Sequence, residues 1–341
     1  MFKRSGTSST DILIAVIIVL ALGVGLVAFL GIDTTGRKGN GLGEEFDYDL
    51  SEQRQVDPKL ILYNQSGEFA VTLKQPRGIA VDSSDKIYVS GDNAISIFDQ
   101  QGNKLSEIEL SGAGRSLAID DEGTVYVILK DHVEVYNKNG RLKESWETLA
   151  ADAVLTSIAI RRNDVFVADA GNRIVYRYDT TGKIKNTIGR KDQARNIPGF
   201  VVPSPYFDLA VASDGLLRVV NPGRHRIEAY TFDGNLEFYW GKFSPAVEGF
   251  CGCCNPANFA MLKNDGFVTC EKGLTRIKMY DADGLFVGVV AGPAQFVEHD
   301  RLCGEKSADC TAGGLDVAVD STGRILILDP NLGMVRIFVR K

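Results

Sequence analysis

The sequence predicts an all-β fold, a six-bladed β-propeller, preceded by a single N-terminal transmembrane helix. Three observations carry this prediction. An apolar-Ala-apolar triplet recurs six times, each triplet is followed by a tight turn and further short apolar strands, and one long uncharged stretch lies before all of them. Short hairpins repeated along a chain are typical of propellers, in which each repeat forms one blade.

The uncharged stretch, residues 12–32, is long enough to cross a membrane. As a helix it extends about 30 Å at 1.5 Å per residue. A cleaved signal has a shorter apolar region, about 7–15 residues, and ends in an A-x-A-like site, and the stretch has neither property. Lys3 and Arg4 precede it and acidic residues dominate after it. We therefore expect a single-pass signal anchor, with residues 1–11 cytoplasmic and the remainder extracytoplasmic, in the periplasm if the source is a bacterium.

Residues 33–57 are rich in glycine and charge and lack a sustained apolar period, which predicts a flexible linker. Their Gly39-x-Gly41-x-Gly43 motif follows no predicted strand, so it does not indicate a phosphate-binding loop. The propeller is expected to occupy residues 58–341.

The repeats are counted from their triplets. The central alanines are Ala80, Ala118, Ala159, Ala210, Ala260 and Ala318. Glycine follows in turns such as Glu122-Gly123 and Asp214-Gly215, where it supplies the positive φ of a tight hairpin. Strands rich in β-branched and aromatic residues come next. Six triplets predict six blades.

Several segments of roughly residues 60–341 resemble NHL repeats. Examples are RGIAVDSSDKIYVS, DVFVADAGNRIVYRYDTTGKI and GLDVAVDSTGRILILD. The resemblance implies strands A to D running from the axis outward. The last repeat stops after its third strand, so we expect residues 68–74 to close the ring as its fourth. Residues 60–63 also look like a third strand, and the pattern does not place them in the closing blade.

The NHL topology implies that D-to-A connections and B-to-C turns share one face. Three long D-to-A segments, 189–206, 242–256 and 291–313, precede the last three blades, and long loops are often functional. We predict that they bind a protein partner through apolar side chains, with plugging of the channel end as the alternative. These side chains are Pro198, Phe200, Tyr206, Phe243, Phe250 and Phe296.

All six cysteines map to the same face. They are Cys251, Cys253, Cys254, Cys270, Cys303 and Cys310. An even number in an oxidising compartment predicts disulfides, whereas converging thiolates also suit zinc or an iron–sulfur cluster. The spacing matches no ferredoxin run and no twin-arginine signal is present, which favours disulfides. Either hypothesis requires at least four of the sulfurs to lie together, with Cys253 and Cys254 reaching different partners.

Signals for catalysis are sparse. The chain has no GxSxG elbow, HExxH helix or phosphate loop. Some NHL proteins are metal-dependent lyases, so the resemblance suggests the hypothesis that the three histidines bind a metal ion. The alternative is that they are ordinary turn residues, because the turn around His225 has an ordinary NHL sequence. The histidines are His132, His225 and His299. Carboxylates at strand A ends are expected to cap turns; they are Asp82, Asp120 and Asp320.

These observations favour a membrane-anchored extracytoplasmic binding or scaffold module over an enzyme. The alternative is a zinc- or iron–sulfur-carrying component of a membrane electron-transfer system, and a lesser alternative is a metal-dependent lyase or lactonase-like propeller. A net charge of -6 gives no indication of a nucleic-acid partner.

Overall fold

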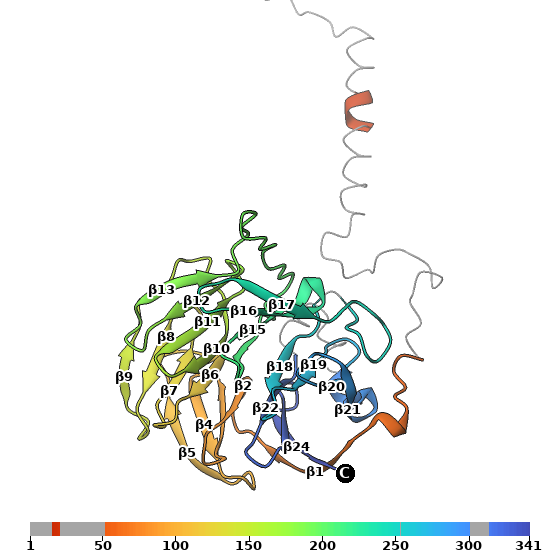
Figure 1. The fold of residues 1–341 in the computed structure, drawn as a ribbon, viewed down its shortest axis with the longest axis horizontal. Helices are drawn as coiled ribbons and strands as arrows, with labels where there is room; N and C mark the ends of the chain where they lie inside the picture. Colours follow the sequence, from red (N-terminus) through yellow and green to blue (C-terminus); the bar gives the residue numbers. More distant parts are fainter. Residues whose placement is uncertain (1–15, 21–51, 253, 301–313) are drawn as a thin grey trace, which may run out of the picture. The chain divides into compact units, whose positions relative to one another are not determined.

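The computed structural model describes residues 16–20, 52–252, 254–300 and 314–341 (Figure 1). The chain divides into two compact units, Met1–Leu50 and Ser51–Lys341. In the first, residues 16–20 are helical and exposed, and the rest of the expected span 12–32 lies outside the described residues. The helices that are described include none with the length and apolarity needed to span a bilayer. The anchor and the linker therefore remain predictions.

The second unit is a ring of six four-stranded antiparallel sheets, which confirms the predicted six-bladed propeller. Blade 1 is β2 (Pro76–Val81), β3 (Ile87–Gly91), β4 (Ala94–Phe98) and β5 (Lys104–Glu109). Blade 2 is β6 (Ser116–Ile119), β7 (Val125–Ile128), β8 (Val133–Tyr136) and β9 (Leu142–Ser145). Blade 3 is β10 (Leu155–Arg161), β11 (Asp164–Asp169), β12 (Ile174–Tyr178) and β13 (Ile184–Ile188).

The remaining blades follow the same order. Blade 4 is β14 (Leu209–Val211), β15 (Leu217–Asn221), β16 (Arg226–Tyr230) and β17 (Leu236–Trp240). Blade 5 is β18 (Asn258–Met261), β19 (Phe267–Cys270), β20 (Ile277–Tyr280) and β21 (Phe286–Ala291). Blade 6 is β22 (Asp316–Val319), β23 (Ile325–Asp329) and β24 (Met334–Arg340), completed by β1 (Tyr63–Ala70). Single 3₁₀ turns lie at η2 (Pro58–Leu60), η3 (Pro222–Arg224) and η4 (Pro293–Gln295).

Each strand position has its own burial pattern. Most residues of the B and C strands are buried, and β7 and β8 are buried along their whole length, because neighbouring blades cover both faces. The outer strand β9 is exposed along its whole length and is correspondingly polar. The A strands contact the A strands of adjacent blades around the axis. The small triplet alanines fit this narrow ring, and larger residues lie opposite them on strand B, as in the pair Ala80–Tyr88.

The ring closes through the N-terminal strand, as expected, but this strand lies earlier than residues 68–74. Strand β1 pairs with β24 from Tyr63–Arg340 to Ala70–Met334. Ile61 forms a parallel bridge to Val289 of blade 5. Residues 60–63 therefore cross the junction between blades 5 and 6 instead of competing for the third-strand slot.

A glycine turn locks neighbouring blades together. Gly182, between strands C and D of blade 3, has φ +81°, and a Cβ there would come within 2.6 Å of Trp146, which follows blade 2. Gly284 of blade 5 meets Trp240 of blade 4 in the same way, at 2.2 Å. Only glycine satisfies both the backbone angle and the close approach.

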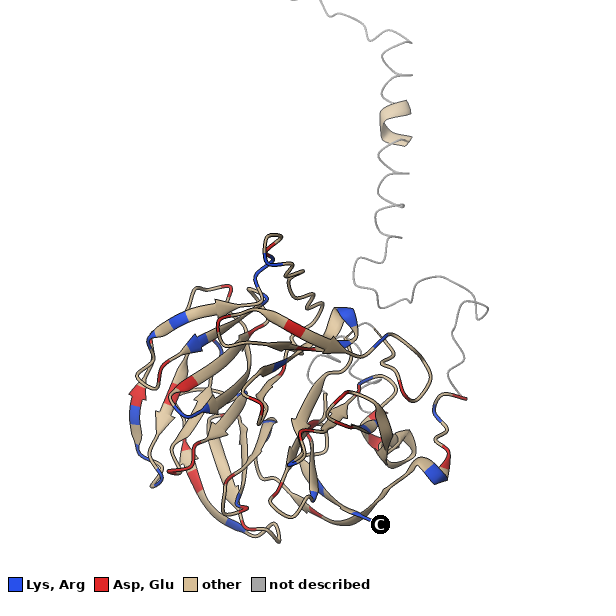
Figure 2. Cartoon of the chain, in the orientation of Figure 1, with Lys and Arg blue, Asp and Glu red and all other residues tan. Residues whose placement is uncertain are grey.

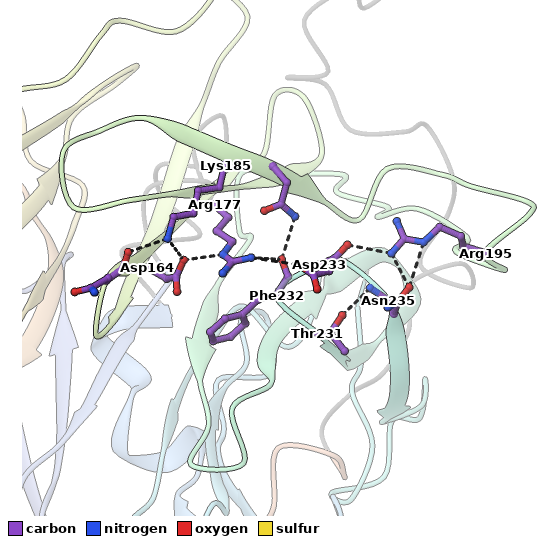
Figure 3. Close-up of polar contacts among 10 residues, drawn as sticks. Asp164, Arg177, Lys185, Arg195, Thr231, Phe232, Asp233 and Asn235 are labelled. Atoms are coloured by element: carbon purple, nitrogen blue, oxygen red, sulfur yellow. Dashed lines mark hydrogen bonds and ion pairs between the residues drawn. The ribbon is translucent and has the colours of Figure 1, made fainter.

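Blades 3 and 4 are also joined by a polar clamp on the turn between β16 and β17 (Figure 3). Arg177 of β12 donates to Asp164 at 2.7 Å and to the carbonyl oxygen of Phe232 at 3.2 Å. From the 189–208 connection, Arg195 donates to the Asp233 carbonyl at 3.0 Å. The clamp holds the start of the first long connection against blade 4.

The predicted turn caps are confirmed. In each case one carboxylate oxygen accepts hydrogen bonds from the backbone N–H groups two and four residues later. The capping residues are Asp82, Asp120 and Asp320. Local turn geometry thus accounts for these carboxylates.

Candidate functional site at the axial mouth

The long connections lie on the face where strand A begins, and each is fixed to the blade that it enters. Asn221, at the end of β15, accepts a hydrogen bond from the Val201 N–H at 2.9 Å. Glu271, directly after β19, accepts one from the Cys251 N–H at 3.1 Å. Asp329, at the end of β23, contacts Nδ1 of His299 at 2.9 Å. The connections are therefore part of the folded blades rather than free loops.

Blade 5 holds its connection with buried charge. Arg276 donates to Glu271 at 2.6 Å, and Lys278 lies 3.1 Å from the same carboxylate. Lys278 also donates to the carbonyl of Gly249 in the connection. Burial lowers the pKa of Lys278 to about 8, although Glu271 acts in the opposite direction. The single carboxylate of Glu271 contacts both cations and offsets one of their two positive charges.

The aromatic side chains predicted to form a binding surface are mostly buried. Phe200, Tyr206, Phe250 and Phe296 are all at most 7% exposed. Phe200 packs against Phe207 and Tyr230 in the core between blades 3 and 4. Burial therefore leaves little of these four rings accessible to a partner, and Tyr206 lines a cavity at the end of the channel. Pro198 is partly exposed, and Phe243 is 62% exposed, which leaves these two as the accessible members of the set.

The described cysteines lie at the start of blade 5. Cys270 is completely buried at the end of β19, and burial raises the pKa of its thiol. Asn255, next to Cys254, donates to the carbonyl groups of Cys251 and Lys272, which brings these segments together. No disulfide joins two cysteines of the described part of the chain. Cys253, Cys303 and Cys310 lie outside it, so the predicted grouping of at least four sulfurs remains a prediction.

The three histidines have separate surroundings. His132 contacts Asp131 at 2.8 Å, and His225 stacks near the exposed ring of Phe243. His299 is held by Asp329 on blade 6. Within residues 52–252, 254–300 and 314–341, no three His, Cys, Asp or Glu side chains are arranged to hold a metal ion.

A polar ring surrounds the axis, two residues before each triplet alanine. Around the ring stand Gly78, Ser116, Ser157, Asp208, Asn258 and Asp316. Several members join neighbouring blades: Ser157 donates to Asp208 at 2.5 Å, and Asn258 donates to the Leu315 carbonyl at 2.8 Å. Asp316 accepts from the Ile79 N–H at 2.9 Å, linking blade 6 to blade 1. The ring thus helps to keep the propeller closed.

The two ring carboxyls are shifted in pKa. Asp208 and Asp316, at the starts of the A strands of blades 4 and 6, are each partly exposed. Burial raises the pKa of Asp208 to about 6, and burial together with the charge of Asp208 raises that of Asp316 to about 7. Since the two groups influence each other, they titrate as a pair. Hydrogen bonds from Phe259 N and Ile79 N hold them in the wall.

Above this ring lies a cavity of about 580 Å³, hereafter the axial mouth. Residues at or near the A-strand starts of all six blades line it, together with part of the blade 6 turn. The lining comprises Lys74, Gln75, Pro76, Arg77, Arg115, Leu155, Thr156, Pro205, Tyr206, Asn258, Gly314, Pro330 and Asn331. Its size falls in the range of small-molecule sites, about 300–1,000 Å³.

The charge of the axial mouth has one sign. Lys74, Arg77 and Arg115 line it, and no Asp or Glu does so among the described residues. None of the three cations forms a salt bridge within the described part of the chain. Burial and the neighbouring charge of Arg77 lower the pKa of Arg115. Elsewhere cationic and acidic segments are interspersed around the propeller (Figure 2), so the mouth is a local concentration of positive charge.

This site was not predicted from the sequence, although the repeats contain a signal for it. When the repeats are aligned on their triplet alanines, Arg77 and Arg115 occupy the same position, three residues before Ala80 and Ala118. Equivalent positions of consecutive repeats lie side by side in a propeller. The alignment therefore brings two guanidinium groups together at the axis.

Comparisons with known proteins show the fold. No model of a known protein family matches the chain, and no curated protein matches its sequence. Membership of the NHL-repeat family therefore remains a prediction. Among solved structures, a streptogramin B lyase aligns over 84% of this chain and 100% of its own, with 13% identity and a TM-score of 0.58.

The virginiamycin B lyase from Staphylococcus aureus aligns over 82% and 100%, with 14% identity and a TM-score of 0.56. A protein of unknown function from Bacteroides thetaiotaomicron aligns over 82% and 72%, with 15% identity and a TM-score of 0.56. The chain has the fold of a six-bladed β-propeller. At such identities the similarity reaches no further than the fold.

Proposed function

We propose that this protein is a ligand-binding propeller that takes its ligand at the axial mouth. The carrying observation is a cavity of about 580 Å³, built by all six blades and lined by cations without a described counter-ion. Guanidinium groups stay protonated at any ordinary pH, so they hold a ligand rather than transfer protons. Binding therefore suits the residues of this site better than acid–base catalysis does.

The same proposal includes the location of the propeller. The uncharged stretch 12–32 and the basic residues before it support a membrane anchor with the propeller outside the cytoplasm. In that arrangement the axial mouth samples the extracytoplasmic space. The exposed Phe243 and the partly exposed Pro198, on two of the long connections, are accessible to a larger partner.

A site-specific crosslinking experiment tests this proposal. A photoreactive benzoylphenylalanine is placed in the full chain at Gln75, whose side chain lines the mouth and bonds only to Arg77 among the described residues. Asn139, an exposed residue in the β8–β9 turn on the opposite face, is the control position. Illumination of cells should yield an adduct at position 75 and none at position 139.

A third probe at Phe243 separates binding at the mouth from binding at the long connections. Adducts at 243 without adducts at 75 would move the binding site to the long connections. Equal labelling at 75 and 139, or none at 75, would overturn the proposal.

A further inference from the structure

We infer that the axial mouth binds a small organic molecule through an oxyanion, a carboxylate or a phosphate, held between Arg77 and Arg115. This inference rests on the proposed function and specifies the chemical class of its ligand.

The first argument is geometric. Arg77 immediately precedes ring residue Gly78, and Arg115 immediately precedes ring residue Ser116. Strands β2 and β6 are neighbours around the axis, so both side chains belong to the same quadrant of the mouth. Planar guanidinium groups present paired N–H donors that match the spacing of carboxylate and phosphate oxygens. Equivalent positions in the other blades hold uncharged residues, which confines the feature to blades 1 and 2.

The second argument is electrostatic. The two guanidinium groups are close enough for Arg77 to lower the pKa of Arg115, and Asp131 opposes this effect without reaching salt-bridge distance. Asp131 is itself engaged with His132. Arg77 is exposed and Arg115 is partly buried, so an anion bound between them would offset the repulsion that acts on Arg115. The Arg77 side chain has a single hydrogen bond among the described residues, to Gln75 at 3.0 Å, and Arg115 has none. A ligand oxyanion would supply the missing partner.

The third argument concerns the rest of the cavity. Apart from its three cations the described lining is uncharged and partly apolar, with Leu155, Pro205 and Pro330. Asn258 and Asn331 add amide groups that can bind neutral polar atoms. The mouth therefore suits an organic body with one anionic end better than a bare ion. The ring carboxyls accept hydrogen bonds from the wall and do not line the mouth.

The test measures binding of two probes, citrate and inorganic phosphate, to the purified full chain by isothermal titration calorimetry at low and at about 150 mM salt. Either probe should bind saturably, and the better one identifies the oxyanion. The variant R77A/R115A should lose at least about tenfold in affinity for each guanidinium removed. The affinity of R77K/R115K should lie between those of the wild type and R77A/R115A, because lysine keeps the positive charge but lacks the planar pair of N–H donors.

The matched control is R141A. Arg141 is an exposed cation in the β8–β9 turn, on the opposite face, and has no salt bridge among the described residues. Its removal should leave probe binding unchanged. R77A/R115A should also keep or raise the thermal stability of the free protein, since it removes a repulsion. A structural role would instead lower that stability.

Two outcomes overturn the inference: no saturable binding of either probe, or equal affinity in R77A/R115A and the wild type. The photocrosslinker at position 75 keeps this failure separate from failure of the proposed function. Adducts that persist in R77A/R115A would retain the mouth as a binding site while rejecting the oxyanion. Absence of adducts in the wild type would reject the site itself.

Discussion

The two halves of the propeller differ in the segments that enter their blades. Blades 1 to 3 are entered through the short connections 71–75, 110–115 and 146–154, whereas blades 4 to 6 are entered through 189–208, 241–257 and 292–315. The short-connection half places Arg77 and Arg115 at the axial mouth, and its ring positions are Gly78, Ser116 and Ser157.

The long-connection half contributes different chemistry. Its ring positions are Asp208, Asn258 and Asp316, and it adds aromatic and amide groups to the mouth. It also buries charged groups, such as Arg276 and Lys278, to fix its connections. The same repeat unit therefore serves two purposes. Blades with short connections leave cationic side chains accessible to a ligand, whereas blades with long connections use their polar groups to hold those connections in place.

The largest expected effect lies in the buried charges of the long-connection half. Removing Glu271 by E271A leaves Arg276 and Lys278 buried without compensation, which should lower the free energy of unfolding by about 3–5 kcal/mol. K104A in the short-connection half breaks an exposed pair with Glu107 and should cost about 0–1 kcal/mol. Urea unfolding followed by circular dichroism measures both. Similar losses in the two variants would remove this difference between the halves.

The ring carboxyls should make stability depend on pH. The pKa values of Asp208 and Asp316 rise on folding from 3.8 to about 6 and about 7. A raised carboxyl pKa means that the folded state binds more protons, so the contribution to stability is present below about pH 4 and is lost as the pH rises to about 7. Each group should account for about 1–2 kcal/mol of this loss in the free energy of unfolding, because solvent screens the partly exposed carboxyls.

The double variant D208N/D316N should flatten this dependence between pH 4 and 7. D214N is the control, because Arg218 holds the pKa of Asp214 low and that carboxylate stays ionised throughout the range. Urea midpoints measured across the range decide the matter. A wild-type slope that survives in the double variant would contradict the assignment.

The glycine turns should show what the halves have in common. G182A in the short-connection half and G284A in the long-connection half both drive a Cβ into a tryptophan. Both should lose about 1–3 kcal/mol beyond the cost of the positive φ. G215A has the same φ requirement with no atom within 4 Å, and should show that cost alone, about 1 kcal/mol. Thermal unfolding compares the three, and equal losses would show that the tryptophan contact is not limiting.

The smallest expected effect concerns the reactivity of the cysteine thiols. All six cysteines belong to the long-connection half. Cys270 is completely buried with a raised thiol pKa, whereas Cys251 is partly exposed. In the native protein, iodoacetamide should therefore modify Cys251 well before Cys270. Peptide mapping with and without reduction also tests the predicted disulfides among the six cysteines, including Cys253, Cys303 and Cys310, which lie outside the described residues. Faster modification of Cys270 would contradict its burial.

The blade number was predictable because the apolar-Ala-apolar triplet occurs once in each blade, on its innermost strand. The exact closing strand was not, because residues 60–63 and 68–74 are equally strand-like. Their positions depend on a bridge to Val289 in another blade, a contact that no local pattern encodes.

The role of the aromatic residues in the long connections was also beyond sequence reasoning. The local sequence around a phenylalanine in a loop does not indicate whether its side chain faces solvent or fills a gap between blades. Phe200 and Phe250 are buried by neighbouring blades, while Phe243, only a few residues from Phe250, is exposed. The mouth arginines, by contrast, were within reach of a repeat alignment, because they share one position in consecutive repeats.

The contact between Trp146 and Gly182 has a practical consequence. The chain has two tryptophans, and the other, Trp240, sits against Gly284 and packs on Phe267 and Tyr280. Each indole thus occupies the seam between two blades, one at blades 2 and 3 and the other at blades 4 and 5. Intrinsic fluorescence of the unlabelled protein is therefore a native gauge of blade separation, with one emitter in each half of the ring.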